Sequence, residues 1–166
     1  MKLLPATTQI EWTEVQGLIQ ELIAWDVNEC ERLGFARDDV VRTFYPATLA
    51  DIRRQSAAPR GCFLIADDQG VAVGCAAYRP LAEDICELYD VYVCAKYRGR
   101  GIASDLVKQL QSSAAAAGYR MMYLETASFM TNAQTLYRSL GFESFPHYRS
   151  VPDQFVAGTI SMRCAL

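Results

Sequence analysis

Histidine, paired cysteines and long apolar runs are scarce or absent in this sequence, and each absence removes a class of protein. The only histidine is His147, and the six cysteines lie apart, with no C-x-x-C pair among them. A structural zinc site needs several His or Cys ligands, so we expect no metal. Nothing indicates export to an oxidising compartment, so a disulfide framework is not expected either.

No apolar stretch approaches the roughly 20 residues that a membrane-spanning helix needs. The first residues, Lys2 to Pro5, also lack the apolar centre of a signal peptide. These features predict a soluble, cytoplasmic protein with no membrane partner.

An excess of basic residues is also missing. The chain has 16 lysines and arginines against 19 aspartates and glutamates, a formal net charge of −3 at pH 7. Proteins that bind nucleic acid usually carry a basic excess, so we expect no nucleic-acid partner. The length of 166 residues and the 51% share of hydrophobic residues predict one folded domain and exclude a disordered chain.

The first part of the chain predicts a short strand followed by helices. Met1–Ala6 is expected to be an edge strand, because its proline is tolerated only at a sheet edge. Thr8 and Glu11 have the spacing of a capping box, and apolar residues then recur at helical spacing. A second helical stretch is expected within Asp38–Ser56, with Pro46 near a helix start.

The rest of the chain predicts a hairpin and then strands that alternate with helices. Cys62–Ala66 and Val71–Tyr78 flank an acidic turn that ends in Gly70, the pattern of a β-hairpin. The elements expected after it are a strand at Asp84–Cys94, a helix from about Ile102 to Ala117, a strand at Tyr119–Thr126, a short helix at Asn132–Leu140 and a strand region at Phe142–Leu166. This order predicts an α+β or mixed α/β layered fold.

A basic loop with two glycines separates the strand at 84–94 from the helix that follows it. Its sequence is Tyr97-Arg98-Gly99-Arg100-Gly101-Ile102-Ala103-Ser104. A helix start carries free backbone N–H groups and the positive end of the helix dipole, which favour phosphate. Gly99 and Gly101 allow a tight turn and the close approach of a ligand. The loop predicts a phosphate site, although such a segment can also be only a turn.

Three blocks of this sequence resemble the GCN5-related N-acetyltransferase (GNAT) family. Arg98, Gly101 and Ala103 match the family's Q/R-x-x-G-x-G/A signature. Glu87–Val93 resembles the family's fourth strand, and Asn132–Phe142 resembles its N-x-x-A/L-x-x-L-Y-x-x-x-G-F region. The blocks follow one another in the family's order, and the resemblance runs from about Phe63 to Phe145, half of the chain.

The resemblance implies a six- or seven-stranded mixed sheet, mostly antiparallel and flanked by helices, in which the fourth and fifth strands splay apart. It implies acetyl-CoA as co-substrate, with the pantetheine arm between those strands. The residues that it assigns to the cofactor are the backbone of Val91, Tyr92 and Val93 for the arm, the amides of Arg98, Gly99, Arg100, Gly101, Ile102, Ala103 and Ser104 for the pyrophosphate, and Asn132 and Tyr137 as further contacts. Asn132 is also a candidate cap for its helix.

Acetyl transfer to an amine needs a proton for the departing thiolate, and Tyr137 is the candidate donor. The resemblance places a tyrosine near the CoA sulfur at this position. A phenol with a pKa of about 10 suits that role. With Leu136, Leu140 and Phe142 nearby in the sequence, packing of the short helix is the alternative role.

Glu87 is the favoured base for the amine proton. A carboxylate in an otherwise apolar strand is expected to have a raised pKa, and the family often carries a glutamate here. Strand alternation places Glu87, Tyr89 and Val91 on one face. A solvent-facing strand end is the alternative for Glu87, and Asp90 or a chain of waters are alternative bases. His147 is disfavoured as an ordinary surface histidine.

The residues and the resemblance together predict transfer of an acetyl group from acetyl-CoA to a primary amine of a small molecule, by direct attack in a ternary complex. A protein- or peptide-directed acetyltransferase and a non-catalytic acyl-CoA-binding regulatory module are the alternatives. One domain over residues 1–166 is expected to consist of a helical substrate-side segment (about 1–60), an acetyl-CoA-binding core (about 63–145) and a terminal strand region (146–166). A homodimer is considered, since twofold dimers are the commonest oligomers. Arg79 is considered as a clamp for a substrate carboxylate, with solvent exposure as the alternative.

Overall fold

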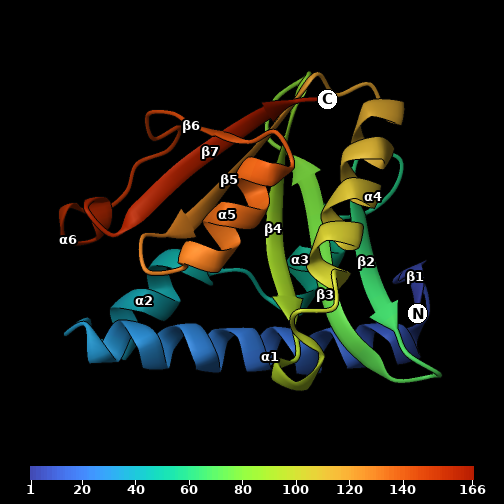
Figure 1. Cartoon of the computed structure of the whole chain (residues 1–166), viewed down its shortest axis with the longest axis horizontal. Coiled ribbons are helices and arrows are strands. Elements are labelled where there is room, and N and C mark those ends of the chain that lie inside the picture. The colour runs from blue at the N-terminus through green and yellow to red at the C-terminus, as the bar shows by residue number, and fades with distance from the viewer.

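The computed structural model describes the whole chain, residues 1–166. Seven strands form one sheet in the order β1-β2-β3-β4-β5-β7-β6, and helices cover both faces (Figure 1). The strands are β1 (Lys2–Pro5), β2 (Cys62–Asp67), β3 (Ala72–Pro80), β4 (Ile85–Val93), β5 (Met121–Ala127), β6 (Glu143–Ser144) and β7 (Thr159–Ala165). The helices are α1 (Gln9–Arg32), α2 (Arg37–Phe44), α3 (Leu49–Gln55), the 3-10 turn η1 (Ala95–Tyr97), α4 (Ile102–Ala116), α5 (Thr131–Ser139) and α6 (Asp153–Val156).

Neighbouring strands are antiparallel except β4 and β5, which run parallel. The mixed, mostly antiparallel sheet that the resemblance implies is therefore confirmed. The predicted hairpin is formed by β2 and β3, and β1 lies at the sheet edge, where its proline is tolerated.

Local sequence determines where the first helix begins and ends. The Thr8 hydroxyl accepts a hydrogen bond from the Glu11 N–H at 3.3 Å, and the Glu11 carboxylate accepts one from the Thr8 N–H at 2.7 Å. This reciprocal pair is the predicted capping box. α1 ends at Arg32, shortly before Gly34, whose φ of +92° suits a residue without a side chain.

The segment expected to contain one further helical stretch contains two helices. α2 ends at Phe44 and α3 begins at Leu49. Pro46 lies between them and disfavours the helical conformation of the residue before it, so a continuous helix cannot pass this point. Thr48 then starts α3 with a second capping box, in which Asp51 is the reciprocal partner.

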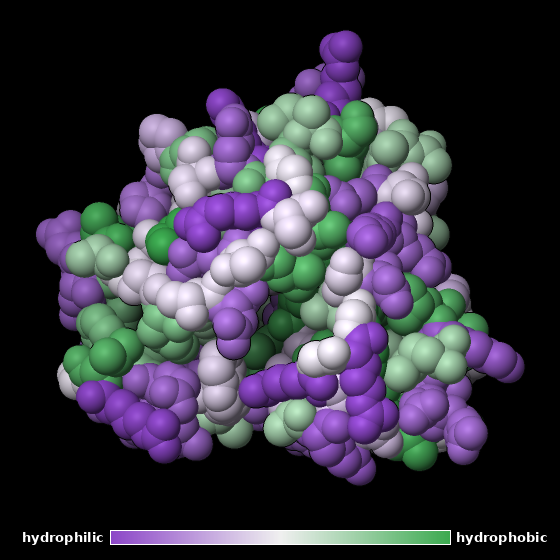
Figure 2. Space-filling view, viewed as in Figure 1, coloured by the Kyte–Doolittle hydropathy of each residue, from purple (hydrophilic) through white to green (hydrophobic).

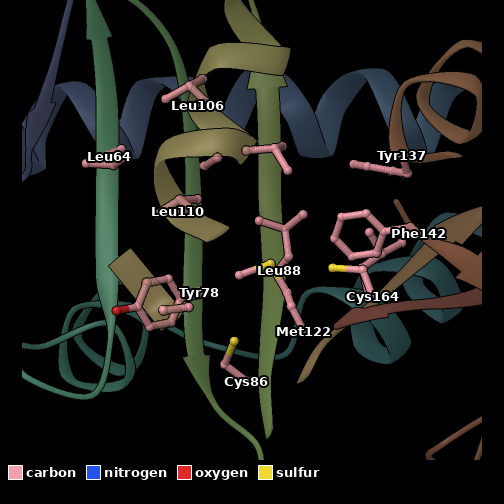
Figure 3. Close-up of a cluster of buried hydrophobic side chains, with 14 of the residues drawn as sticks. Leu64, Tyr78, Cys86, Leu88, Leu106, Leu110, Met122, Tyr137, Phe142 and Cys164 are labelled. Atoms are coloured by element: carbon pink, nitrogen blue, oxygen red, sulfur yellow. The ribbon is translucent and has the colours of Figure 1, made fainter. Parts of the chain in front are cut away.

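Buried apolar side chains form a cluster on each face of the sheet. The larger cluster lies between the sheet and the helices α4 and α5, and Leu88, Leu106 and Met122 belong to it (Figure 3). The smaller cluster lies between the sheet and α1, where the rings of Trp12 and Phe63 are 5.3 Å apart. A third cluster joins the end of α1 to α2 and α6. None of the helices combines the length and apolar character that crossing a membrane requires.

A β-bulge changes which face the side chains of β4 occupy. The register between β3 and β4 shifts, so that one residue of β3 stands opposite two of β4. Asp90 lies in the bulge with a φ of +52°, which aspartate tolerates better than most residues. The predicted alternation is therefore wrong beyond Tyr89. Tyr92 joins Tyr89 on the α1 side, and Val91 packs on the α4 side.

Two expectations for the C-terminal part need correction. The region 142–166 contains more than strand, because a loop and the one-turn helix α6 separate β6 from β7. Asn132 does not cap α5, since the helix starts one residue earlier, after Met130, and no side-chain hydrogen bond caps it. Asn132 is instead an exposed residue of the first helical turn.

Candidate active site

β4 and β5 pair at their first residues and then separate. The paired residues are Ile85–Glu87 of β4 and Met121–Tyr123 of β5, and no pairing joins Leu88–Val93 to Leu124–Ala127. The bulge bends β4, while β5 stays paired with β7 along its whole length. In Figure 1 the two strands diverge toward α1, and Figure 2 shows a hollow with hydrophobic residues at its floor between α5 and the end of β4. The splayed strands that the resemblance implies are present.

α4 begins just beyond β4 with free backbone donors. Its N-cap is Gly101, with a φ of +81°, and Gly99 has a φ of +75°. A Cβ atom at either glycine would meet nothing within 4 Å, so both face open space. No side chain caps the helix, and its first backbone hydrogen bond runs from the Asp105 N–H to the Gly101 oxygen at 3.0 Å. The amides of residues 102–104 are therefore free to bind an anion such as a pyrophosphate.

Arg98 connects this loop to the end of β4. Its Nε donates to the Val93 carbonyl at 3.0 Å. Its guanidinium lies 5.5 Å from the ring centre of Trp25 and 5.8 Å from that of Tyr92. A carbonyl oxygen has two lone pairs, so Val93 can still accept a hydrogen bond from a ligand. Arg98 thus fixes one positive charge beside the free amides, and Arg100 adds an exposed one.

Tyr137 extends from α5 toward β4 (Figure 3). The residue is 7% exposed, and its ring packs edge-on against Phe142 at 5.7 Å between ring centres. Burial raises the pKa of the Tyr137 hydroxyl. The hydroxyl therefore stays protonated at neutral pH, as a proton donor must. The packing role and the proton-donor role considered for Tyr137 are compatible with this position.

Glu87 lies at the last paired position of β4 and is the centre of a buried ion-pair network. Only 1% of its surface is exposed. Arg79 Nε and Nη2 both lie 2.7 Å from its Oε2, and the Tyr148 hydroxyl and Arg149 Nη2 both donate to its Oε1. These donors fill the roughly four lone-pair positions of a carboxylate. Proton uptake by Glu87 would have to displace one of them.

The same network engages both arginines. Arg79 Nη1 donates to Gln55 Oε1 at 2.7 Å, so every nitrogen of its guanidinium has a partner. Arg149 Nε donates to Glu125 Oε2 at 2.7 Å. Arg79 is therefore an ion-pair partner of Glu87, and both roles considered from the sequence, a free clamp and a solvent-exposed side chain, are wrong.

Asp90 offers a freer carboxylate than Glu87. It is partly buried in the bulge, and its side chain makes no hydrogen bond or salt bridge within the protein. Burial raises the pKa of Asp90 to about 6, an effect that Arg79 opposes and Glu87 reinforces. Burial also raises the pKa of Tyr45, and the negative charge of Asp90 contributes to that rise. The Asp90 carboxylate therefore lies within electrostatic range of Tyr45, the residue after α2, as well as of Arg79 and Glu87.

The loop between β6 and α6 supplies two site residues that sequence reasoning missed. Tyr148 and Arg149 reach Glu87 across sequence separations of 61 and 62 residues. Aromatic contacts hold the loop in place. Phe145 and Tyr148 are stacked with ring centres 5.8 Å apart, and Tyr123 of β5 contacts both rings at 4.7 and 5.3 Å.

His147 lies in the same loop but has a different contact. Its Nδ1 is 3.0 Å from the Ser161 hydroxyl oxygen, and the residue is exposed. The run of aromatic and basic residues at 145–149 was the usable signal for this loop, and its tyrosine and arginine, rather than its histidine, reach β4.

A family model described as the acetyltransferase (GNAT) family matches residues 28–142, well over half of the chain. Similar curated proteins include an uncharacterized N-acetyltransferase, YjgM, of Escherichia coli, 35% identical over 88 residues, and the probable N-acetyltransferase family 8 member 5 of Mus musculus, 30% identical over 118 residues. The matches cover 51% and 68% of this chain and 53% and 52% of the relatives. The chain thus spans about half the length of the curated relatives it matches.

Solved structures share the fold at low sequence identity. A GNAT-family acetyltransferase of Staphylococcus aureus has a TM-score of 0.76 at 17% identity, with 99% of this chain and 98% of that chain covered. A putative acyl-CoA N-acyltransferase of Klebsiella pneumoniae has a TM-score of 0.72 at 23% identity, with 99% and 97% covered. The splayed strands and the uncapped helix start agree with the family match, and this chain belongs to the acetyltransferase (GNAT) family.

Proposed function

We propose that this chain transfers the acetyl group of acetyl-CoA to a primary amine of a small molecule, by direct attack with both substrates bound. The observation that carries the proposal is the gap between β4 and β5, which ends at the uncapped start of α4. An extended arm fits beside a strand edge that has lost its partner, and a pyrophosphate fits free helix amides. Membership of the family implies an acyl-CoA co-substrate.

The residues present fit coenzyme A at two points. The backbone of Val91, Tyr92 and Val93 lies on the part of β4 that pairs with β3 but not with β5, so its free edge can form hydrogen bonds with the pantetheine arm. The amides that we assign to the pyrophosphate belong to Gly99, Arg100, Gly101, Ile102, Ala103 and Ser104. The Arg98 amide, also expected from the sequence, instead donates to the Ala95 carbonyl oxygen at 3.3 Å, so Arg98 contributes its charged side chain. Asn132, exposed in the first turn of α5, is a further proposed contact.

The proposed reaction joins the amine nitrogen to the acetyl carbonyl carbon and breaks the bond from that carbon to sulfur. The amine gives up one proton, and the departing thiolate takes one up. We assign the donation to Tyr137, whose raised pKa keeps the hydroxyl protonated until the thiolate leaves. Asp90 accepts the amine proton, directly or through water, and solvent reprotonates the tyrosine.

The contacts of the two candidate carboxylates favour Asp90 over Glu87 as the base. The lone pairs of Glu87 are occupied by arginine and tyrosine donors, whereas no donor holds the Asp90 carboxylate. A pKa of about 6 for Asp90 is near neutral pH, where a general base is most effective. In this proposal Glu87 holds Tyr148 and Arg149 and so positions the loop that carries them. The assignment of Glu87 as the base, made from the sequence, stays a prediction.

A small acceptor suits the covered side of the gap. α1 packs on β4 through Tyr92 and reaches the loop after β5, because the rings of Trp25 and Phe129 are 6.2 Å apart. The loop at 145–151 covers the same side near Glu87. In this proposal the first 60 residues form the acceptor side, and their cover over the gap favours a small amine over a protein segment.

Binding of acetyl-CoA and acetylation of an amine test the proposal. Acetyl-CoA at about 100 times its dissociation constant adds about 2.7 kcal/mol of stability. At about 2–4 °C per kcal/mol, the expected rise in Tm is about 5–11 °C. NAD and ATP, which lack the pantetheine arm, should give smaller shifts. Release of free CoA thiol with a panel of primary amines then measures transfer. Equal shifts from all three nucleotides, or binding without thiol release from any amine, would contradict the proposal.

A further inference from the structure

Two buried side-chain polar atoms have no hydrogen-bond partner in the protein, the Tyr89 hydroxyl oxygen and Glu125 Oε1. The last pair that joins β4 to β5 is Glu87 with Tyr123, and each unpartnered residue follows it by two positions along its own strand. A step of two residues returns a side chain to the same face of a sheet. Both side chains therefore lie on the face of Glu87, the acceptor side, at the level where the strands separate.

Glu125 is the stronger ligand-binding candidate of the two. Its side chain is 10% exposed, and only Oε2 is engaged, by Arg149 Nε at 2.7 Å. A buried carboxylate oxygen without a donor is costly, and an N–H group of a ligand would remove that cost. Tyr89 stays neutral, because burial raises the pKa of its hydroxyl. The neutral hydroxyl can donate a hydrogen bond to a ligand or accept one from it.

Carboxylates outnumber cations on this side of the gap. The two arginines of the ion-pair network are matched by its two glutamates. Asp90 adds a carboxylate without an ion-pair partner, and Asp26, which is 5% exposed, adds one whose hydrogen-bond partners are neutral. Arg98 lies 5.8 Å from the ring centre of Tyr92, whose hydroxyl donates to the Glu21 carboxylate, so a carboxylate lies near this cation as well. The excess negative charge favours a positively charged acceptor.

A carboxylate on the acceptor would meet unfavourable surroundings. All nitrogens of Arg79 are engaged, and Arg149 is held by Glu87 and Glu125. No free guanidinium fork is left to bind a carboxylate in the two-pronged geometry that such groups prefer. The carboxylates of the site would repel it.

We propose that the acceptor is a cationic amine without a carboxylate, and that Glu125 selects it by accepting a hydrogen bond from an ammonium group at Oε1. This inference rests on the proposed acetyl transfer and adds the substrate class. An aliphatic diamine is the simplest molecule of this class, because one nitrogen can be acetylated while the other keeps its charge.

Cadaverine and lysine test the inference on the wild-type protein, since they differ by a single carboxylate. We expect kcat/KM for cadaverine to exceed that for lysine by about tenfold or more, through a lower KM. Equal values, or a preference for lysine, would overturn the inference while leaving amine acetylation in place. Absence of transfer to any amine would overturn the proposed function instead.

Glu125→Gln tests the residue, because it keeps the shape of the side chain and removes the charge. The variant should raise the KM for cadaverine about 10- to 100-fold, leave the KM for acetyl-CoA unchanged and narrow the preference for cadaverine over lysine. Glu143→Gln is the matched control, because Glu143 is an exposed β6 residue that pairs with Arg163, and it should change none of these values. An unchanged KM for cadaverine in Glu125→Gln would refute the role of Glu125.

Binding gives a readout that does not depend on turnover. Calorimetry of cadaverine added to the protein saturated with CoA should show binding in the wild type and about tenfold or more weaker binding in Glu125→Gln. This result with no acetyl transfer would support recognition by Glu125 and reject the proposed reaction. Cadaverine binding of equal strength in both proteins would reject the recognition itself.

Discussion

Glu87→Gln is expected to destabilise the protein, because one buried carboxylate holds donors from two separate parts of the chain. Arg79 of β3 donates from one side, and Tyr148 and Arg149 of the loop between β6 and α6 donate from the other. Glutamine keeps one acceptor oxygen and presents an NH2 group in place of the second. Whichever way the amide points, a donor meets a donor, and Arg79 loses its only ionic partner.

The size of the effect follows from the exposure of the partners. Removing one member of a buried ion pair costs about 3–5 kcal/mol. The Glu87 side chain is 2% exposed and that of Arg79 is 23% exposed, so loss of this pair should cost nearly the full amount for a buried pair. The Arg149 side chain is 44% exposed, and solvent screens its pairing, so it adds little. We expect a loss of about 3 kcal/mol, which at about 2–4 °C per kcal/mol lowers Tm by about 6–12 °C.

Differential scanning calorimetry of the wild type, Glu87→Gln and Glu143→Gln at pH 7 measures this change in Tm. A total stability of about 5–15 kcal/mol is typical, so Glu87→Gln should remain folded at room temperature. The control is Glu143→Gln, whose ion pair with Arg163 has side chains 68% and 41% exposed. Exposed pairs contribute about 0–1 kcal/mol, so its Tm should stay within about 4 °C of wild type. A Tm of Glu87→Gln equal to that of the control would refute the structural role of Glu87.

Three further substitutions test the cofactor loop and the proton transfers. Gly101→Asp should abolish detectable acetyl-CoA binding, because it places a negative charge beside the free amides. Gly101→Asn tolerates the positive φ equally but carries no charge, so it should bind acetyl-CoA at least about tenfold more tightly than Gly101→Asp. Equal affinities of the two variants by calorimetry would show that the loop is only a turn. Tyr137→Phe should lower kcat at least about 10²-fold with little change in the KM for acetyl-CoA, and an unchanged kcat would leave Tyr137 only a packing role. Wild-type kcat/KM should rise with pH through about 6, because the base must be deprotonated to act, and Asp90→Asn should lose that limb. If Asp90→Asn keeps the limb and Glu87→Gln loses it, the base is Glu87.

The features that the sequence predicted correctly depend on residues close together in the chain. Thr8 and Glu11 form a capping box within one helical turn, and the β2–β3 hairpin needs only its own turn residues. The tight turn before α4 is similar, since Gly99 and Gly101 adopt the positive φ values that the pattern requires. The order of elements followed from these local signals, and the resemblance supplied the arrangement of the strands.

The features that the sequence did not predict depend on long-range packing. The surroundings of Glu87 consist of a neighbouring strand and a loop more than 60 residues away, and strand alternation carries no information on either. α5 starts at Thr131, so Asn132 lies inside the helix and not at the capping position. A difference of one or two residues is within the usual uncertainty of helix ends. The bulge at Asp90 left no marker other than an aspartate in an apolar strand.

The bulge accounts for how one strand can serve two substrates. A regular β4 would pair with β5 along its whole length and would present alternate side chains to each face. The extra residue bends the strand, so its second half loses β5 as a partner and keeps a free backbone edge for an extended ligand. It also holds Asp90 in a left-handed conformation, without a donor to occupy its carboxylate. The free edge and the free carboxylate therefore have a common cause, and a change that removed the bulge would remove the proposed cofactor site and the proposed base together.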